Sequence, residues 1–424
     1  MSSPDVVIVG AGLAGLAAAK QVVAAGLSSV VLESSDQAGG RVRTDHVDGF
    51  RLDRGFQVLL TAYPEARRAL DFAALELRTF AAGAVVYIDG VPRRVVDPWR
   101  HPASVFAAAF SPVGSFADKL RLAAFRYQVL RGDPYSAFGL PERSTIDMLR
   151  SRHFSPSMIE RFFRPFFGGI LLDPGLESSA AMASFAFRMF SEGDGAVPRL
   201  GMQQMPQQLV DRLPSGTVRL GMKVVEVDEG RVRFVDAAGT AGDLRPKAVV
   251  VAVPGSALLK TGKDVRGYRR VVNVYVAGVG PSPRRGGYLI LDGDRGKHGP
   301  AANLAFMSDV SSDYAPADRH LASWSLLGPE ASALPDTDLY AAVLRQGAAW
   351  FGPDAVKSWR PLRIYRIDRA LPRQNAPWYT TPSWPVRVRR GLYVAGDERD
   401  TASIDGALRS GRLAAEALLT DLRG

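Results

Sequence analysis

Three glycines near the start of the chain have the spacing of a dinucleotide-binding loop. Gly10, Gly12 and Gly15 form the pattern G-x-G-x-x-G, with Ala14 inside it. In such a loop the first glycine permits a tight turn, the second lets backbone approach a pyrophosphate, and the third lets a helix pack closely on a strand. Glu33 stands 18 residues after Gly15, where a carboxylate can bind ribose hydroxyls. An acid at this point favours FAD or NAD over NADP, whose extra phosphate would require a cation.

The elements predicted around this loop are the ones that such a site needs. An apolar run covers 6–9, an alanine-rich helical stretch covers 16–25, and a second apolar run covers 30–32. A strand, a glycine turn, a helix and a strand in this order are typical of a parallel βαβ unit. The N-terminus of the helix would then face the negative charge of the phosphates.

A second motif follows Glu33 closely. Gly40 and Arg41 belong to the segment 39–44, GGRVRT, in which a flexible turn precedes a guanidinium that can bind two phosphate oxygens. With this segment the sequence resembles the flavoprotein superfamily of amine oxidases, phytoene-type carotenoid desaturases and protoporphyrinogen oxidases. The family fingerprint is G-x-G-x-x-G, then a Glu, then G-G-R-x-x-T. The resemblance implies FAD as the cofactor.

The far end of the chain extends the resemblance. Residues 391–397 (GLYVAGD), 403–407 (SIDGA) and 410–412 (SGR) look like the C-terminal FAD motif of the family. The resemblance implies that Gly396 and Asp397 lie at the ribityl–phosphate part, and that Ser403 and Ile404 bring backbone to the edge of the flavin ring. A helix that begins near Ile404 could stabilise negative charge on the reduced ring with its positive end.

Two further segments match positions that the family uses for its cofactor. Val224 lies in a strand similar to the one whose valine backbone holds the adenine. Gly55, Phe56 and Gln57 fall where the family places chain against the isoalloxazine. Phe56 and Gln57 are therefore also candidates for the substrate pocket.

The residues expected of an amine oxidase are absent from the matching positions. Amine oxidases of this superfamily commonly carry a lysine that is water-linked to flavin N5, and Asn273 stands at its place. No lysine lies between Lys263 and Lys297. Where the family's amine cage has an aromatic residue before the C-terminal helix, residues 401–403 are Thr, Ala and Ser. These differences disfavour amine oxidation. The segments 403–407 (SIDGA), 410–412 (SGR) and 369–372 (RALP) look closer to the desaturase and protoporphyrinogen-oxidase branches, whose substrates are large and hydrophobic.

We therefore predict an FAD-dependent oxidoreductase that removes hydride from an isoprenoid-, carotenoid- or tetrapyrrole-like substrate. Phe162, Phe163, Phe166 and Phe167 could line its pocket, or they could be the core of a helical domain, and Asn273 is a further candidate for the pocket. No catalytic acid or base is identified, and flavin chemistry does not require one. With one complete G-x-G-x-x-G, oxygen or a quinone is the expected electron acceptor. The alternatives are a flavin amine oxidase and a non-catalytic, flavin-stabilised binding module.

The composition excludes several other classes of protein. No cysteine occurs among the 424 residues, so disulfides, thiolate metal sites and cysteine nucleophiles are excluded. The five histidines lack metal-ligand spacing, and we expect no metal site. The net charge of +10 is not accompanied by an aromatic–basic module, so nucleic acid is not an expected partner.

The expected location is cytoplasmic, with peripheral membrane contact as an added possibility. No signal peptide precedes the first strand, and no apolar run approaches the ~18–20 residues that span a bilayer. The segment 93–131 holds seven cations against Asp97 and Asp118. Within this segment, the apolar pattern of residues 116–130 predicts a helix that is apolar on two faces. Such a helix packs on both sides, or it contacts an anionic lipid surface with one of them.

The expected fold class is α/β. A discontinuous Rossmann-type FAD-binding domain is predicted from residues 1–80, 198–258 and 386–424. An inserted α+β substrate domain is predicted from residues 81–197 and 259–385.

Overall fold

The predicted parallel sheet is present, and β1 lies at its centre. The computed structural model describes residues 3–96, 113–228, 230–254, 258, 267–294, 296–377 and 385–423. In the sheet β1 pairs in parallel with β2 and β14, β21 continues beyond β14, and the edges are β10 and the antiparallel β20. The strands are β1 (Val6–Val9), β2 (Ser29–Leu32), β10 (Val218–Arg219), β14 (Ala248–Val251), β20 (Arg387–Arg389) and β21 (Leu392–Val394).

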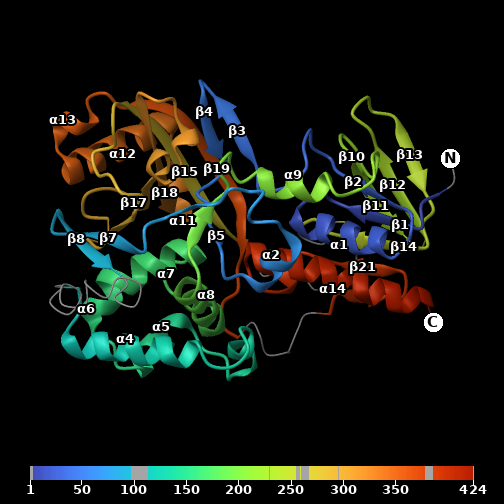
Figure 1. Ribbon diagram of the computed structural model, residues 1–424, viewed down its shortest axis with the longest axis horizontal. Coiled ribbons are helices and arrows are strands. Elements are labelled where there is room, and N and C mark those ends of the chain that lie inside the picture. The colour runs from blue at the N-terminus through green and yellow to red at the C-terminus, as the bar shows by residue number, and fades with distance from the viewer. Residues whose placement is uncertain are drawn as a thin grey trace.

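Both faces of this sheet are covered, which explains why its central strands are apolar throughout. On one face α1 (Leu13–Ala24) and α14 (Ile404–Arg423) pack against each other and on the sheet. On the other face lies an antiparallel three-stranded sheet of β11 (Lys223–Asp228), β12 (Arg231–Val235) and β13 (Ala241–Leu244). Figure 1 shows these elements together at one end of the molecule. Helix α1 begins at Leu13, three residues before the alanine-rich stretch that predicted it.

A seven-stranded sheet forms the other half of the molecule, in the order β19-β15-β18-β17-β16-β7-β8. Its pairs are antiparallel except for β16 with β7. One face packs on α11 (Gly328–Ala333), α12 (Asp336–Phe351) and α13 (Pro353–Val356), and the other faces the parallel sheet and a group of helices. The strands are β7 (Gly83–Ile88), β8 (Val91–Val96), β15 (Tyr268–Val279), β16 (Leu289–Asp292), β17 (Ala301–Phe306), β18 (Arg319–Leu327) and β19 (Arg360–Pro372).

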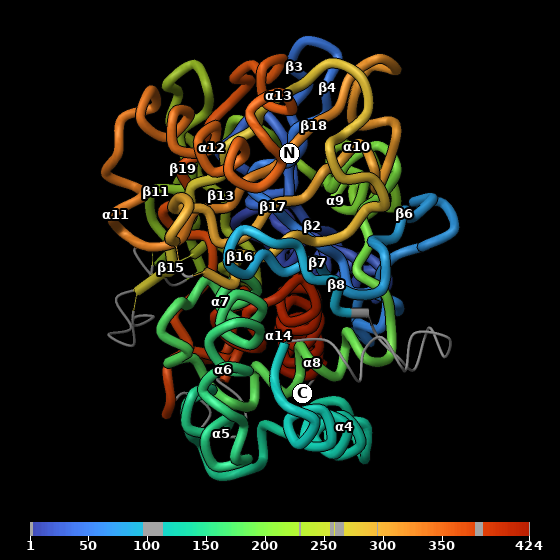
Figure 2. Tube along the Cα trace, turned by 90° about the vertical axis from the view of Figure 1, so that its left-hand side faces the viewer, coloured from blue at the N-terminus to red at the C-terminus, as the bar shows by residue number. Residues whose placement is uncertain are grey.

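The group of helices, here called the helical lobe, lies below the seven-stranded sheet (Figures 1 and 2). Its largest members are α4 (Phe116–Val129) and α8 (Ala180–Glu192), which pack on each other. Ser115 and Asp118 form a capping box at the start of α4. The smaller members are η2 (Ser136–Gly139), α5 (Thr145–Ser151), α6 (Pro156–Met158), the π-helical η3 (Ile159–Phe163) and α7 (Arg164–Leu171).

Short elements connect the two halves. The hairpin of β3 (Thr44–Val47) and β4 (Phe50–Asp53) leaves the parallel sheet and contacts the seven-stranded one. The remaining elements are β5 (Leu59–Leu60), α2 (Pro64–Ala69), β6 (Arg78–Thr79), β9 (Gly195–Val197), α9 (Gln204–Val210), α10 (Met307–Val310), η4 (Ser312–Tyr314) and η5 (Asp397–Arg399). The α/β class is thus confirmed. The parallel sheet takes strands from the beginning, middle and end of the chain.

The contact between α1 and α14 depends on Gly411. A Cβ at this position would lie 2.0 Å from the carbonyl oxygen of Ala14, so the two helices could not keep their distance. We expect Gly411→Ala to lower the free energy of unfolding by about 1–3 kcal/mol through overpacking. The matched control is Gly139→Ala, because a Cβ there meets no described atom within 4 Å. Thermal unfolding of both variants measures the effect, and an equal change in Tm would contradict it.

Candidate functional site

Each of the three loop positions requires glycine for a different structural reason. Gly10 has a φ of +98°, and a Cβ there would lie 2.8 Å from Val253. A Cβ at Gly15 would lie 1.9 Å from the carbonyl oxygen of Gly10, so this glycine sets the approach of α1 to the loop. A Cβ at Gly12, by contrast, would meet none of the described atoms within 4 Å. The backbone at Gly12 therefore borders open space, as a loop that receives a pyrophosphate requires.

Glu33 directly follows β2 and is held against this loop. Its Oε2 accepts a hydrogen bond from the backbone N–H of Ala11 (2.8 Å), and its Oε1 accepts from the backbone N–H of Ser35 (2.9 Å). The backbone carbonyl of Glu33 accepts from Met222, just before β11. Val224 is therefore close to Glu33 along that strand, and its side chain packs beneath the parallel sheet. Glu33 and Val224, the residues predicted to bind the ribose and the adenine of FAD, are thus neighbours.

Arg41 and Asp397 come from opposite ends of the chain and meet in a two-pronged ion pair. Arg41 Nη1 donates to Asp397 Oδ2 at 2.9 Å, and Nη2 donates to Oδ1. Arg41 Nη1 also donates to the carbonyl oxygen of Ala370, at the end of β19. Burial and the charge of Asp397 raise the pKa of the adjacent Glu398 to about 7. The two residues predicted to bind the phosphate and ribityl parts are thus brought together, next to Gly40, whose Cβ position lies 3.4 Å from Gly12 Cα.

At the start of α14, no side chain among the described residues caps the first amide of the helix. Ser403 precedes the helix, and its Oγ accepts from the backbone N–H of Gly406 (3.0 Å). That bond satisfies the third helical amide, while the amide of Ile404, at the first position, has no acceptor within the helix. Gly396 is fixed nearby, since its N–H donates to Ser410 Oγ of α14 at 3.0 Å. A partial positive charge is therefore available at Ile404 for a ligand.

The segment 53–57 is anchored by a buried carboxyl group. Asp53 accepts hydrogen bonds from Tyr314 Oη (2.7 Å) and the backbone N–H of Met202 (2.9 Å), and Tyr275 Oη donates to its backbone carbonyl (3.0 Å). Burial raises the pKa of Asp53 to about 6. Because Tyr275 belongs to β15, these bonds fix the segment to the seven-stranded sheet.

Gly55 and Gln57 let the segment 53–57 pack closely against β19 and bond to the segment around Arg41. Gly55 has a φ of +96°, and a Cβ there would lie 2.6 Å from Ile367 of β19. Gln57 Nε2 donates to the carbonyl oxygens of Arg41 (2.7 Å) and Arg54 (3.1 Å). The segment predicted to lie along the flavin ring is therefore bonded to the segment predicted to bind its phosphates.

Phe56 is half-buried and begins an aromatic wall that sequence reasoning only partly found. Its ring packs edge-on against Phe80 at 6.0 Å, and Phe166 of α7 packs on Phe190 of α8 at 5.4 Å. The two pairs meet at Gly195, where a Cβ would lie 3.8 Å from Phe80 and 3.7 Å from Phe190. We call Phe56, Phe80, Phe166 and Phe190 the aromatic wall. All four are half-buried and pack against the main hydrophobic core. No signal in the sequence pointed to Phe80 or Phe190.

The other predicted pocket residues lie in fully buried positions. Phe163 and Phe167 stack on each other at 5.7 Å within the helical lobe, which is the core arrangement that the sequence left open. Asn273 is also fully buried, and its Nδ2 donates to Ser323 Oγ (3.0 Å) and to the carbonyl oxygen of Trp324 (3.1 Å). The Asn273 amide therefore bonds within the sheet, and Phe166 rather than Phe163 or Phe167 reaches accessible space.

Comparison with known proteins identifies the family. The model of the flavin containing amine oxidoreductases matches residues 13–419. The chain belongs to this family. It is an FAD-dependent oxidoreductase, and the geometry of Gly12, Glu33, Arg41 and Asp397 fits that cofactor.

Individual relatives are distant or match in part. Putrescine oxidase of Kocuria rosea is 42% identical over 85 residues, 20% of this chain and 18% of that protein. Coproporphyrinogen III oxidase of Propionibacterium freudenreichii subsp. freudenreichii is 28% identical over 39% of this chain and 31% of that protein. These matches therefore span less than a third of either relative. Hydroxysqualene dehydroxylase of Rhodopseudomonas palustris is 28% identical over 98% of this chain and 99% of that protein.

Solved structures show the same fold. A protein from Exiguobacterium sp. 255-15, a candidate protoporphyrinogen oxidase by name, matches with a TM-score of 0.70 over the whole of both chains, at 18% identity. Within the described ranges, no helix is long and apolar enough to cross a membrane. The same part of the chain contains no cluster of three or more His, Asp or Glu side chains placed to hold a metal ion.

The loop glycines give a direct test of the cofactor site. We expect Gly12→Val to weaken FAD binding by more than about tenfold, because its side chain would fill the open space over the loop. It should leave the Tm of the FAD-free protein almost unchanged. Gly15→Ala is the contrasting variant, since its Cβ overlaps Gly10 and should lower that Tm. FAD titration and thermal unfolding measure both, and full FAD affinity in Gly12→Val would contradict the assignment.

Proposed function

We propose that the protein oxidises a large hydrophobic substrate of the isoprenoid or tetrapyrrole kind, by loss of hydride to bound FAD. The observation that carries this proposal is the aromatic wall. Its four phenylalanines are half-buried, and Phe56 belongs to the segment expected to lie along the flavin. A wall of this kind buries apolar surface of a substrate and offers it no charged partner.

The comparisons support a hydrophobic substrate. The relative that aligns over nearly its whole length is named for hydroxysqualene, an isoprenoid. Another is named for coproporphyrinogen III, a tetrapyrrole. Carried over to this chain, either name describes a molecule large enough to need an extended apolar pocket.

The structure also speaks against the amine-oxidase alternative, despite the local match to putrescine oxidase. Asn273 is fully buried and uses its amide N–H groups on Ser323 and Trp324, so it offers no free donor in place of the lysine ammonium. The turn before α14 contains Thr401 and Ala402, both buried, and contributes no aromatic ring to an amine cage.

The residues of this chain would bind and orient, while FAD supplies the hydride acceptor when it is bound. Gly12 and Arg41 would hold the phosphates, Glu33 the ribose, and Asp397 the ribityl part. The positive end of α14 at Ile404 would stabilise negative charge on the ring. The aromatic wall would place the substrate and exclude water. We propose oxygen or a quinone as the final acceptor.

Anaerobic bleaching of the visible flavin band tests the substrate class. We expect bleaching by porphyrinogens or detergent-dispersed isoprenoids and none by primary or secondary amines. Bleaching by amines alone would overturn the proposal, and bleaching by neither panel would favour a non-catalytic, flavin-stabilised module.

The aromatic wall can be tested with the substrate that bleaches the flavin. Phe166→Ala should lower kcat/KM by about tenfold or more, because the transition state loses a packed ring. Leu140→Ala is the control, since Leu140 is an exposed apolar residue of the helical lobe outside the aromatic wall. An unchanged kcat/KM in Phe166→Ala would remove the wall from the pocket.

We further propose that α4 contacts a membrane surface from which such a substrate is taken. Phe116, Leu120 and Tyr127 are 65%, 59% and 67% exposed and share one face of the helix, because positions four and eleven residues apart coincide. Helix α4 lies at the outer edge of the helical lobe in both views (Figures 1 and 2). Residues 97–112 of the predicted contact segment lie outside the described residues.

Two of the cations on α4 bond within the protein, so they are less available to a lipid surface than the sequence suggested. Arg121 pairs with the buried Asp118 at 3.5 Å, and Arg126 donates to the carbonyl oxygen of Ser191 at 3.0 Å. The exposed apolar face of α4, rather than these two charges, is therefore the stronger basis for lipid contact.

Replacing Phe116, Leu120 and Tyr127 together by serine should lower the affinity for anionic phospholipid vesicles by at least about tenfold. Flotation with vesicles measures the bound fraction. The control is Val225→Ser, which removes an exposed apolar side chain from β11. Equal binding by the triple variant and the parent protein would rule out α4 as the contact.

A further inference from the structure

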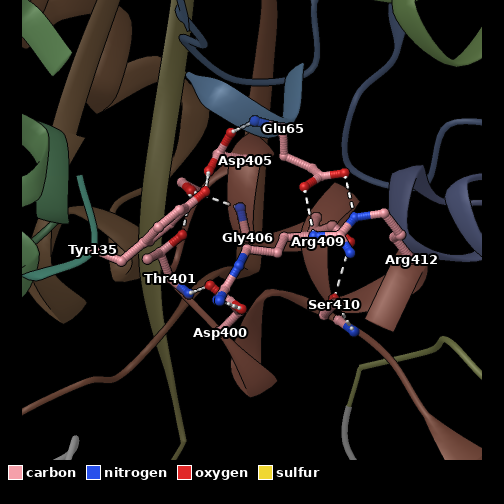
Figure 3. A network of polar contacts seen from close by, with 12 residues as sticks. Glu65, Tyr135, Asp400, Thr401, Asp405, Gly406, Arg409, Ser410 and Arg412 are labelled. Carbon is pink, nitrogen blue, oxygen red and sulfur yellow. Dashed lines mark hydrogen bonds and ion pairs between the residues drawn. The ribbon is translucent and has the colours of Figure 1, made fainter. Parts of the chain in front are cut away.

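A buried acid lies in the first turn of α14. Asp405 is the second residue of the helix and has no exposed surface. Its Oδ1 accepts from the backbone N–H groups of Glu65 (2.7 Å) and Ala66 (3.3 Å) at the start of α2. Its Oδ2 accepts from the hydroxyl of Tyr135 at 2.6 Å (Figure 3). Three neutral donors therefore hold this carboxylate.

The two arginines beside Asp405 bind other acids. Arg409 pairs with Asp400, and its guanidinium lies 4.3 Å from the centre of the Tyr135 ring. Arg412 pairs with Glu65 at 2.8 Å (Figure 3). It also pairs with Glu416 at 2.9 Å. Among the described residues, no ion pair neutralises the charge of Asp405, so its ionisation depends on its hydrogen bonds.

Tyr135 brings the helical lobe to this turn. It stands directly before η2, and its ring stacks on Phe185 of α8 at 5.5 Å. Tyr63, before α2, stacks on Phe185 as well, at 5.9 Å. The position of the Tyr135 hydroxyl is therefore set by α8, while its acceptor belongs to α14. The hydrogen bond from Tyr135 to Asp405 therefore joins the helical lobe to α14.

The charge of Asp405 changes within an ordinary pH range. Burial raises the pKa of Asp405 to about 6, although the Tyr135 hydroxyl and the amides of α2 favour the charged form. The titratable and charged groups around it are Glu65 of α2, Tyr63, Tyr135, Asp400, Arg409 and Arg412. Burial also raises the pKa of both tyrosines, so they stay neutral donors.

We propose that Asp405, held by Tyr135, sets the electrostatic potential at the flavin-facing end of α14. The amide of Ile404 lies one residue before Asp405, at the positive end of the helix. A charged Asp405 opposes that positive end and disfavours added negative charge on a ring bound there. A neutral Asp405 leaves the helix end unopposed. Tyr135 is then a positioning residue, and the inference rests on the proposed placement of Ile404 beside the flavin.

The test is the midpoint reduction potential of the FAD-loaded protein, measured with redox dyes at pH values on both sides of about 6. Asp405→Asn should raise the potential above this pH and remove the extra inflection that Asp405 gives the curve. Tyr135→Phe keeps the stacked ring but loses the donor, so the inflection should shift to higher pH. Tyr340→Phe, at a half-buried tyrosine on α12 on the far face of the seven-stranded sheet, should match the parent protein.

Identical curves for the parent protein and Asp405→Asn would overturn the inference. If Asp405→Asn does not fold, an unmoved inflection in Tyr135→Phe overturns it equally. A purely structural role for Tyr135 would lower Tm and FAD occupancy without moving the inflection. Because no substrate is present, bleaching by amines would overturn the proposed function while leaving these curves as they are.

Discussion

The close approach of the first and last helices is the constraint on which the cofactor site depends. Gly15 and Gly411 leave no room for a Cβ, which would lie 1.9 Å and 2.0 Å from backbone oxygens. With α1 and α14 in this contact, residues nearly four hundred positions apart become neighbours. The pair of Arg41 with Asp397 and the start of α14 at Ile404 follow from that packing. A side chain at Gly411 would move α14 away from α1, and one at Gly15 would move α1 away from the loop at Gly10.

The second constraint is the attachment of the seven-stranded sheet to the half of the molecule that contains the predicted cofactor site. Asp53 has its carboxyl group buried under Tyr314 and its backbone carbonyl bound by Tyr275. Arg41 reaches the end of β19 through the carbonyl oxygen of Ala370. The segment expected to lie along the flavin is therefore held between both sheets, and the aromatic wall continues from it at Phe56. Substrate and cofactor positions are in this way fixed by the same few contacts.

Three buried carboxyl groups near the site, those of Asp53, Glu398 and Asp405, have a pKa that burial raises. The pKa is about 6 for Asp53, about 7 for Glu398 and about 6 for Asp405. A raised pKa means that the folded protein disfavours the charged form, so ionisation of these groups costs stability as the pH rises. Such groups are retained where their charge or hydrogen bonds serve a site. Here they lie beside the phosphate end, the flavin segment and the start of α14.

The sequence by itself determined the cofactor-binding parts that depend on local backbone. The loop glycines and Glu33 after β2 follow from short motifs, because a tight turn or a positive φ leaves few residue choices. The tertiary structure alone decided which phenylalanines reach accessible space. Phe163, Phe166 and Phe167 are alike in sequence, yet only Phe166 faces Phe190. The bond from Tyr135 to Asp405 likewise spans 270 residues, and no local pattern encodes a contact made by packing.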